Sequence, residues 1–285
     1  MPLLLNAADL DRDGLDDAEE QALLEQFLPR FHLDRKECDV SPAEFLPGAT
    51  PRPGERNGTI YGQAFPVERQ REGQWVELHY HHLWARDCGR GGHDLDAEHV
   101  SALVSRTGGV WRAEYWYAAA HESTVCDVSM VRKAGVEARA EVWISSGKHA
   151  SFLSKESCNR GGCGGDKCQE TKVLHVKRLV NVGQKDAPMP GFEWVLSTQW
   201  PLAEKLDSDF HEYLLTSADA NEGLVRASES VKGSQTTLAV GKKPVDAVDT
   251  AVRKTDGALE AGASETAGFL RKAARGVGRF LGKVR

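Results

Sequence analysis

The chain has 285 residues, of which 40% are hydrophobic, and a formal net charge of -6 at pH 7. A chain of this length can bury a full hydrophobic core, in one large domain or two smaller ones. No hydrophobic run approaches the roughly 20 residues that a membrane-spanning helix needs, which excludes transmembrane anchoring. The mildly acidic charge gives no reason to expect a nucleic-acid partner, because nucleic-acid-binding proteins usually carry a basic face.

Residues 1–30 combine an acidic loop with a short helix. The stretch from Asp9 to Glu20 fits the twelve-position loop of an EF-hand, with Gly14 at the sharp turn. Ca²⁺ takes six to eight oxygen ligands, and the loop supplies them from five side chains and one backbone carbonyl: Asp9, Asp11, Asp13, Asp17, Glu20 and the carbonyl of Leu15. Apolar residues at helical spacing predict a helix from Asp17 to Leu28, which Pro29 ends.

The calcium loop departs from the EF-hand pattern in two ways. Position eight, which is usually apolar, is Asp16, and only eight residues precede the loop. It therefore resembles the lone calcium loops of extracellular bacterial proteins, which bind Ca²⁺ at about 10⁻⁴–10⁻³ M. The alternative is an acidic, solvated helix N-terminus that the helix dipole favours without any metal.

Residues 31–216 are expected to form one β domain. Residues 31–56 resemble a loop because they contain four prolines. Further along, short stretches with strand character are separated by glycine-rich turns and show little helical periodicity. This pattern predicts a mainly β fold, an antiparallel β-sandwich of the jelly-roll-like type. The expected strands are Thr59–Phe65, Trp75–Trp84, Asp96–Val104, Gly109–Ala119, Glu141–Ser145 and Lys172–Val180.

The six cysteines all lie in the middle of the chain and none forms a C-x-x-C pair, which argues against zinc ribbons and thioredoxin-like sites. Disulfides formed in an oxidising compartment are the better interpretation, so we expect an extracellular or periplasmic protein. The alternative is a cytosolic protein with buried free thiols. The start of the chain lacks the positively charged region of a signal peptide, which conflicts with export unless a leader has been removed.

The densest cluster of chemically active side chains lies between residues 79 and 99. If Asp96–Val104 is a strand, Asp96 and Glu98 point to the same face, and His93 lies in a glycine-rich turn just before it. These three side chains predict a divalent-metal site, to which Asp87 adds a further oxygen. Mg²⁺, Ca²⁺ or Mn²⁺ would suit it best, with Zn²⁺ as a further option. The alternative is a histidine-rich strand whose polar side faces solvent.

Two further histidines, His149 and His121, each follow a predicted strand. Each is a candidate to complete the metal site or to act as an acid–base group, and each is equally compatible with a structural role. The chain has no G-x-S-x-G, H-E-x-x-H or phosphate-binding glycine-rich motif. Any catalysis would therefore use metal-activated water, with His149 or His121 as the proton carrier.

Two motifs carry a resemblance to known families. The first runs from Gly92 to Val100 and contains His93-x-x-Asp96-x-Glu98-His99, and the second is Gly147-Lys-His149-Ala-Ser-Phe152. Together they resemble the vacuolar protein-sorting-protein-62-like family. The first is also similar to the H-x-x-D-x-E core of the necrosis- and ethylene-inducing (NPP1-type) cytolysins, which are secreted, metal-binding β-sandwiches.

The resemblance to the cytolysins implies a ligand set of His93, Asp96 and Glu98, and more weakly Asp87, whose spacing differs. It covers roughly residues 25–200. Ala97 replaces the tryptophan that lies between the two carboxylates in the family, and Leu95 replaces a glycine. These changes put cytolysin-like target recognition in doubt, while leaving metal binding as an expectation.

The composition changes after about Ser217. Residues 217–243 are expected to be a flexible linker, and residues 244–285 an amphipathic helical tail that begins after Pro244. In residues 269–285 an apolar stripe lies beside regularly spaced arginine and lysine residues, and no acidic residue interrupts it. Such a helix can bind an anionic membrane surface. The alternative is a helix that docks on its own domain or on a partner.

The favoured hypothesis is an exported, calcium- and metal-binding protein that recognises a glycan or a lipid head group through the ion at His93, Asp96 and Glu98. A first alternative is a metal-dependent hydrolase that uses the same ion. A second is a membrane-active or surface-attached protein that acts through residues 244–285.

Overall fold

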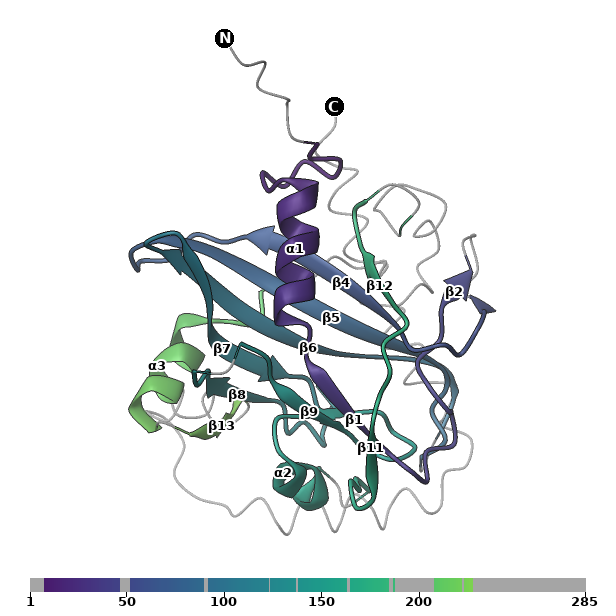
Figure 1. Ribbon diagram of the computed structural model, residues 1–285. Coiled ribbons are helices and arrows are strands. Elements are labelled where there is room, and N and C mark those ends of the chain that lie inside the picture. Colours follow the sequence, from purple (N-terminus) through teal and green to yellow (C-terminus); the bar gives the residue numbers. More distant parts are fainter. Residues whose placement is uncertain are drawn as a thin grey trace, which may run out of the picture.

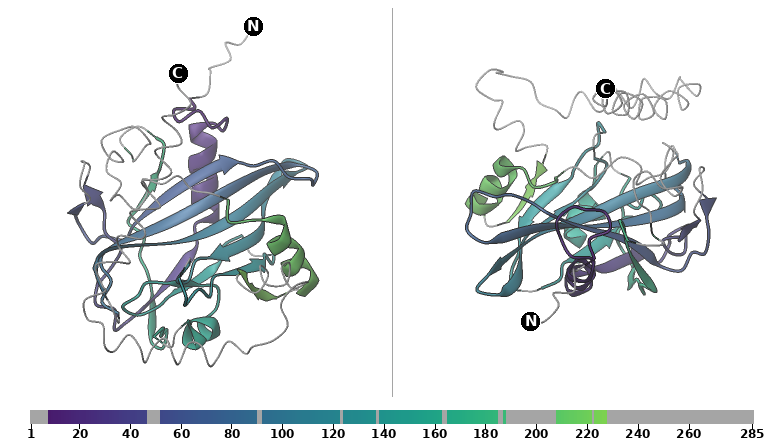
Figure 2. Two further views of the ribbon diagram at one scale, coloured as in Figure 1. Left: turned by 180° about the vertical axis from the view of Figure 1, so that it is seen from behind. Right: turned by 90° about the horizontal axis from the view of Figure 1, so that it is seen from above.

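The computed structural model describes residues 8–46, 52–89, 92–122, 124–136, 138–162, 165–184, 187, 208–221 and 223–227. They form two large β-sheets and one two-stranded sheet, with a helix on either side of the largest sheet (Figures 1 and 2). Of the expected linker, residues 217–221 and 223–227 are described, and the rest of it lies outside the described residues, as does the basic tail. Within the described part, no helix is both long and apolar enough to cross a membrane.

The larger sheet has seven strands in the order β12-β4-β5-β6-β7-β8-β13. All neighbours in it are antiparallel except β12 and β4, which are parallel. Its two long central strands, β5 and β6, carry most of the side chains discussed below. The strands are β4 (Thr59–Pro66), β5 (Gln74–Arg86), β6 (Asp94–Thr107), β7 (Val110–Ala118), β8 (Met130–Lys133), β12 (Arg178–Asn181) and β13 (Leu224–Arg226).

The smaller sheet has the order β10-β9-β1-β11, in which β1 and β9 are parallel. Its strands are β1 (Arg30–Asp34), β9 (Glu141–Ile144), β10 (Ser151–Phe152) and β11 (Thr171–Val173). A separate short pair consists of β2 (Phe45–Leu46) and β3 (Arg52–Pro53). The helices are α1 (Asp17–Phe27), α2 (Lys155–Arg160) and α3 (Glu212–Asn221).

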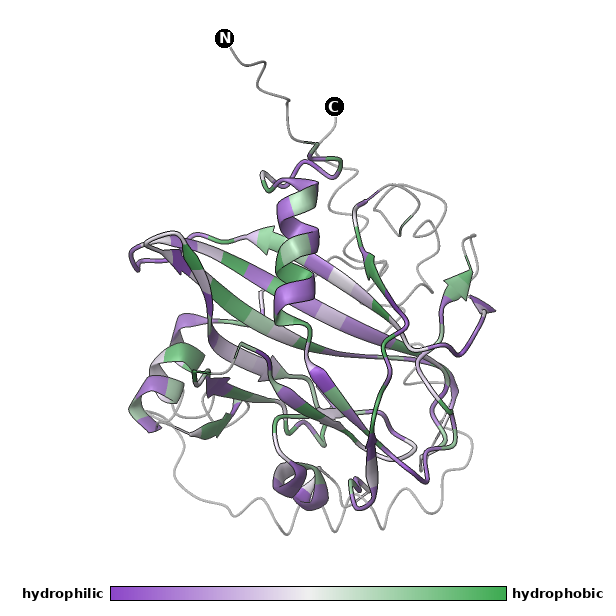
Figure 3. Ribbon diagram, in the orientation of Figure 1, coloured by the Kyte–Doolittle hydropathy of each residue, from purple (hydrophilic) through white to green (hydrophobic). Residues whose placement is uncertain are grey.

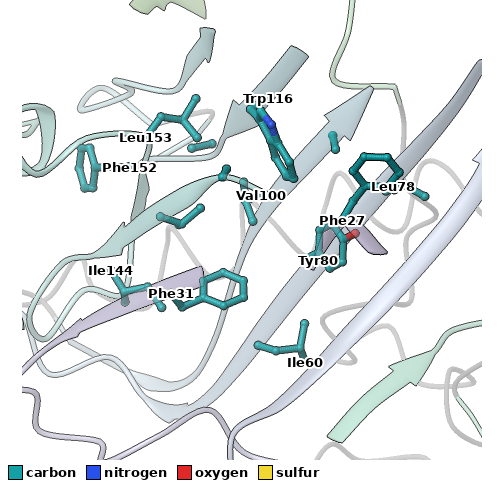
Figure 4. Close-up of a cluster of buried hydrophobic side chains, with 14 of the residues drawn as sticks. Phe27, Phe31, Ile60, Leu78, Tyr80, Val100, Trp116, Ile144, Phe152 and Leu153 are labelled. Carbon is teal, nitrogen blue, oxygen red and sulfur yellow. The ribbon is translucent and has the colours of Figure 1, made fainter. Parts of the chain in front are cut away.

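The main hydrophobic core lies between the two sheets (Figure 4). Side chains alternate along a strand, so every second residue of β5 points into this core, including Leu78, Tyr80 and Trp84. Phe31 on β1 and Phe152 on β10 meet them from the smaller sheet. The mainly β sandwich predicted from the sequence is confirmed.

Helix α1 closes one side of the core. It carries hydrophilic as well as hydrophobic residues (Figure 3), and its Leu23, Leu24 and Phe27 are buried. Asp16 is the N-cap, because its carboxylate accepts hydrogen bonds from the backbone N–H groups of Ala18 and Glu19. Capping of α1 accounts for a polar residue at position eight of the predicted calcium loop.

Three elements differ from the sequence expectations. The stretch expected as one strand, Lys172–Val180, splits into β11 and β12, which belong to different sheets. Strand β1 lies at the start of a segment expected to be loop-like, where it pairs with β9 and β11. Helix α3 spans the expected domain boundary at residues 216/217, and β13 extends the larger sheet to Arg226 by pairing with β8.

Two disulfides lie within the described residues, Cys38–Cys88 and Cys158–Cys168. The first closes a sequence separation of 50 residues and the second of 10. The Cys38–Cys88 bond joins the loop after β1 to the loop after β5. As a result, Glu37 and Asp87, which precede the two cysteines, are tied to the same end of the sandwich.

Candidate functional site

Acidic side chains from distant parts of the chain gather at this end of the sandwich. Strand β6 contributes two of them, the loop after β5 one, the loop after β7 one and the segment before β11 one. We call these five residues the carboxylate cluster: Asp87, Asp96, Glu98, Glu122 and Asp166.

Strand β6 sets the direction of Asp96 and Glu98. The two residues lie opposite Trp84 and His82 of β5, and they share the alternation of Val100, which points into the core. The predicted placement of both carboxylates on one side of the strand agrees with this register. The C-terminal half of β6 therefore packs its apolar side chains in the core, and its N-terminal half contributes Asp96 and Glu98 to the carboxylate cluster.

Glu98 is the electrostatic centre of the cluster. Burial raises its pKa well above the usual range of a glutamate, and four neighbouring negative charges raise it further: those of Asp96, Glu122, Asp166 and Asp87. A carboxyl group in such surroundings favours binding a proton or a metal ion. Three other members of the cluster already face a basic side chain: Asp96 lies beside His149, Asp166 beside His121 and Asp87 beside Lys148. Glu98 is therefore the member at which a bound cation would be most favourable.

His149 lies in the interior of the domain beside the cluster and is not exposed to solvent. The side chain is fully buried, with Nδ1 at 2.8 Å from Asp96 Oδ2 and Nε2 at 3.2 Å from Glu37 Oε1. Burial alone would lower its pKa, but the hydrogen bonds to Asp96 and Glu37 outweigh this and raise the pKa to about 9. The imidazolium also stacks on the indole of Trp84 at 3.9 Å between ring centroids. A buried histidine with a pKa of about 9 is mostly protonated at neutral pH and is therefore a poor general base there.

A chain of neutral hydrogen bonds supports this stack. Trp84 Nε1 donates to His82 Nδ1 at 2.7 Å, and His82 Nε2 lies 2.8 Å from Ser151 Oγ. Burial, and then the charge of His149, lowers the pKa of His82 well below its ordinary value. The His82 ring therefore remains neutral and fixes the orientation of Trp84.

His121 takes part in a second pair at the cluster. Its Nε2 lies 2.8 Å and 3.0 Å from the two carboxylate oxygens of Asp166, and its side chain is 14% exposed. The adjacent Glu122 accepts a hydrogen bond from the hydroxyl of Tyr117. Of the two histidine candidates, His121 is the one that faces solvent.

Asp87 and His93 form the outer rim. His93 Nε2 lies 3.8 Å from Asp87 Oδ2, and Lys148 Nζ lies 3.5 Å from the same oxygen. The His93 side chain is 57% exposed, and its Nδ1 lies 3.0 Å from the backbone carbonyl of Leu95. The predicted ligands thus lie at one end of the sandwich but do not surround a single position.

The chemical type of the ligand atoms and their spacing lead to different conclusions about metal binding at the carboxylate cluster. The oxygen-rich set suits a hard divalent cation. However, among the described residues the ligand atoms of His93, Asp96 and Glu98 are not one of the groups that lie within 4.8 Å of one another. One Asp96 oxygen is engaged by His149, so an ion here would use the other oxygen together with Glu98.

Residues with an unusual, left-handed backbone conformation occur in the same region. Leu95, His121 and His149 all have positive φ angles, of 62°, 56° and 56°. A left-handed conformation is unfavourable for residues other than glycine and is concentrated at functional sites, where surrounding structure holds it. Three such residues around one cluster indicate that its geometry is constrained by the whole domain.

Several residues of this site were missed by sequence reasoning. Glu37 and Asp166 lie far from the central motif along the chain, and only the fold brings them to His149 and His121. Glu122 follows His121 directly in the sequence, but the sequence does not show that its side chain acts on Glu98. The cysteines that flank Glu37 and Asp87 were the one available signal for their proximity.

Three acidic side chains of the predicted calcium loop lie close together. Ligand-type oxygens of Asp9, Asp11 and Asp13 lie within 4.8 Å of one another. The N–H of Gly14, whose φ is 95°, donates to Asp9 at 3.2 Å and so closes the turn. The buried Asp9 Oδ1 has no hydrogen-bond partner among the described residues, which is costly for a carboxylate that no cation neutralises.

Glu20, the last predicted ligand, is buried against the turn after β12. Its Oε2 accepts hydrogen bonds from Asn181 and Gln184 at 3.0 Å each, while its buried Oε1 has no partner in the described part of the chain. Burial raises the pKa of Glu20 to about 8, and the charges of Asp11 and Asp13 contribute to the increase. The donor set and the partnerless buried oxygens fit a bound Ca²⁺.

Leu15 and Asp17 complete the predicted loop. Leu15 is buried, with its N–H bonded to Asp13 at 2.8 Å, and Asp17 accepts a hydrogen bond from the backbone N–H of Leu10 at 2.9 Å. The loop also requires glycine in the turn beneath it. A side chain at Gly183, where φ is 101°, would collide with the Asp11 carboxylate.

Comparison with known proteins yields structural neighbours. No protein-family model and no curated protein matches the sequence. The non-toxic HaNLP3 protein is 12% identical, over 79% of this chain and 95% of its own, with a TM-score of 0.37. NLPPya in complex with glucosamine is 13% identical, over 71% and 96%, with a TM-score of 0.35.

A third neighbour is the Necrosis and Ethylene inducing Protein 2 from the causal agent of cocoa's witches' broom disease. It is 16% identical, over 62% of this chain and 77% of its own, with a TM-score of 0.33. These neighbours are of the necrosis- and ethylene-inducing type that the His93-x-x-Asp96-x-Glu98 motif resembles. At these identities and TM-scores the likeness indicates neither a ligand nor an activity for this chain. The resemblance to the vacuolar sorting family stays a prediction.

Proposed function

We propose that this chain is an exported binding protein that recognises a glycan or a lipid head group through a divalent cation held at the carboxylate cluster. The observation that carries the proposal is the environment of Glu98, a partly buried carboxyl group whose pKa is raised by burial and by four neighbouring acidic residues. Asp96 and Glu98 would hold the ion, with Asp87 and His93 at the rim. A hard cation bound there would offer its open positions to hydroxyl or phosphate oxygens of a ligand.

The surroundings of the cluster support binding more than catalysis. His149, the residue best placed beside Asp96, is fully buried and has a pKa raised to about 9 by its two carboxylate partners, despite the opposing effect of burial. It orients Asp96 and does not reach the surface. The disulfide between Cys38 and Cys88 supports an oxidising, exported location.

The experiment is a metal and ligand titration on the full chain and an Asp96→Asn/Glu98→Gln variant. Glu98→Gln relieves repulsion, whereas Asp96→Asn weakens the pairing with His149, so circular dichroism is used to show that the variant is folded. Asp94→Asn, an exposed change on the same strand, is the matched control. After equilibration with Ca²⁺, Mg²⁺ and Mn²⁺, elemental mass spectrometry should show one ion fewer in the variant than in the parent. On a glycan and lipid array, the variant should lack the signals that chelator removes from the parent. Ligand retention that is unchanged by chelator and by the variant would refute the proposal.

We also propose that the loop from Asp9 to Glu20 binds Ca²⁺ in a structural role. The buried Glu20 joins the loop to Asn181 and Gln184 on the larger sheet, so an ion bound there would stabilise the attachment of α1. Loss of one calcium ion per chain in Glu20→Gln, with the cluster ion retained, is the expected result. Unchanged calcium content would contradict it.

A second candidate function is a metal-dependent hydrolase, and the His121–Asp166 pair is the observation that favours it. A partly exposed imidazole oriented by a buried carboxylate is suited to proton transfer near a metal-bound water. Turnover of an ester or glycoside should then disappear in His121→Asn and persist in His175→Asn, an exposed control. Absence of turnover across a broad panel in the metal-loaded protein would exclude this function. The proposed membrane role of residues 244–285 concerns a segment outside the described residues.

A further inference from the structure

A second polar cluster lies on the opposite face of the larger sheet. Odd-numbered residues of β5 and β6 point away from the main core, toward the side covered by α3, where Leu103 packs with Phe210 and Leu214. This face carries several imidazoles and a carboxylate from the segment before α3. We call them the outer histidine cluster: His79, His81, His99 and Asp209.

Three ligand atoms of the outer histidine cluster already converge. Asp209 Oδ2 lies 3.0 Å from His99 Nε2 and 3.6 Å from His79 Nδ1, and all three atoms lie within 4.8 Å of one another. Zinc binds histidine nitrogen and carboxylate oxygen at about 2.0–2.2 Å, so neighbouring ligand atoms in a tetrahedral site are about 3.3 Å apart. The observed distances lie on either side of that value.

One ring nitrogen of His79 faces Glu77, and the other faces Asp209 of the outer histidine cluster. His79 Nε2 lies 3.3 Å from Glu77 Oε2, and the buried Glu77 is itself held by Arg69 at 2.8 Å and by the hydroxyl of Ser208. A carboxylate behind a histidine is the usual arrangement that fixes the tautomer of a metal ligand. With the proton on Nε2, His79 Nδ1 presents a lone pair toward Asp209 and Ser101, whose Oγ lies 3.1 Å away.

A third imidazole provides an independent observation. His81 stacks on His99 with 5.3 Å between ring centroids, and its buried Nε2 has no hydrogen-bond partner in the part of the chain that the structure describes. A buried nitrogen without a partner beside two other imidazoles is costly in the absence of a ligand.

We propose that His79, His99 and Asp209 bind a zinc ion that fastens the segment Ser208–Asn221 to the outer face of the larger sheet. Two imidazoles and one carboxylate suit Zn²⁺ better than the oxygen-preferring Ca²⁺ or Mg²⁺. Strands β5 and β6 supply the histidines, and the segment before α3 supplies the aspartate, so the ion joins elements about 110 residues apart in sequence. This site lies on the opposite side of β6 from the carboxylate cluster and is independent of the function proposed for it.

The test uses the full chain and three variants. Asp209→Asn is nearly isosteric and removes the charged ligand, and His79→Gln/His99→Gln removes both imidazoles. Asp96→Asn/Glu98→Gln is the control that leaves the outer histidine cluster intact. Each protein is stripped with chelator, equilibrated with Zn²⁺ or Co²⁺ and desalted. Zinc content, the visible absorption of tetrahedral Co²⁺, and the cleavage rate of residues 208–221 by a protease are then measured.

The expected result is one zinc ion and a tetrahedral Co²⁺ spectrum in the parent and in the Asp96→Asn/Glu98→Gln control, with both lost in the two outer-cluster variants. Zn²⁺ should also slow proteolysis of the segment at least tenfold in the parent and leave Asp209→Asn unaffected. The Co²⁺ spectrum of the parent and the control decides the matter even if His79→Gln/His99→Gln fails to fold. A parent without tetrahedral Co²⁺, or zinc that disappears with the carboxylate cluster and not with Asp209, would overturn the proposal and leave a purely hydrogen-bonded contact.

Discussion

Glu20→Gln separates the cost of burying a carboxylate from the benefit of binding calcium. In the metal-free protein, burial raises the pKa of Glu20 from 4.5 to about 8. The folded state then holds a proton that the unfolded chain releases, so stability falls as pH rises from about 4.5 to about 8. At about 1.4 kcal/mol for each tenfold change in the dissociation constant, the upper limit of this loss is about 5 kcal/mol.

The variant removes that loss. The amide of glutamine keeps an oxygen for the hydrogen bonds from Asn181 and Gln184 and carries no charge. Without calcium, Glu20→Gln should be about as stable as the parent near pH 5 and more stable, by up to about 5 kcal/mol, above pH 8. With calcium at about 100 times its dissociation constant, the parent should gain about 2.7 kcal/mol and the variant almost nothing.

Denaturant unfolding at pH 5 to 9, with chelator or with about 10 mM Ca²⁺, measures both effects. Glu25→Gln, an exposed change on the same helix, is the control and should follow the parent throughout. Equal calcium stabilisation of Glu20→Gln would show that the loop is not the calcium site. An identical pH dependence in parent and variant would refute the reasoning from burial.

Three further predictions concern the core and its buried polar groups. Phe31→Ala, at the centre of the sandwich, should lower the free energy of unfolding by about 3–5 kcal/mol in denaturant titrations. Tyr80→Phe removes the hydrogen bond to the carbonyl of Leu24 and should lower it by about 1–3 kcal/mol, with an unchanged circular dichroism spectrum. The His149 pKa of about 9 means that its stabilising charge is fully present below pH 6.5 and lost as pH rises through about 9. In chelator, His149→Gln should therefore destabilise the protein more at pH 6 than at pH 10, and an equal effect at both would contradict this.

The sequence predicted the strands with strong local patterns and missed those that depend on partners. β4, β5 and β7 are rich in β-branched and aromatic residues, and the predicted bounds of these strands and of β6 agree with the structure within a few residues. β1 has only five residues beside a proline-rich segment, and its strand character comes from pairing with β9. Likewise, α3 is held by packing on the outer face, which its polar composition does not reveal.

The same distinction applies to the candidate sites, and β6 shows it within one strand. Its sequence places Asp96 and Glu98 on one side and His99 and Ser101 on the other, which period-two alternation makes predictable. What each side meets is decided elsewhere in the chain. Asp166 and Glu37 complete the acidic side through the loops near the disulfides, and Asp209 completes the histidine side through the segment before α3.

A strand that separates two sites in this way also fixes their relation. The register of Trp84 opposite Asp96 and of His81 opposite His99 is one register, so a slip by a single residue would exchange the two sets of side chains between the faces. Asp96 and Glu98 would then face α3, and His99 would enter the sandwich, away from His79 and His81. Both sites therefore depend on the same pairing of β5 with β6. For this reason, substitutions that test one site should preserve the alternation along β6, as the isosteric changes to Asn and Gln do.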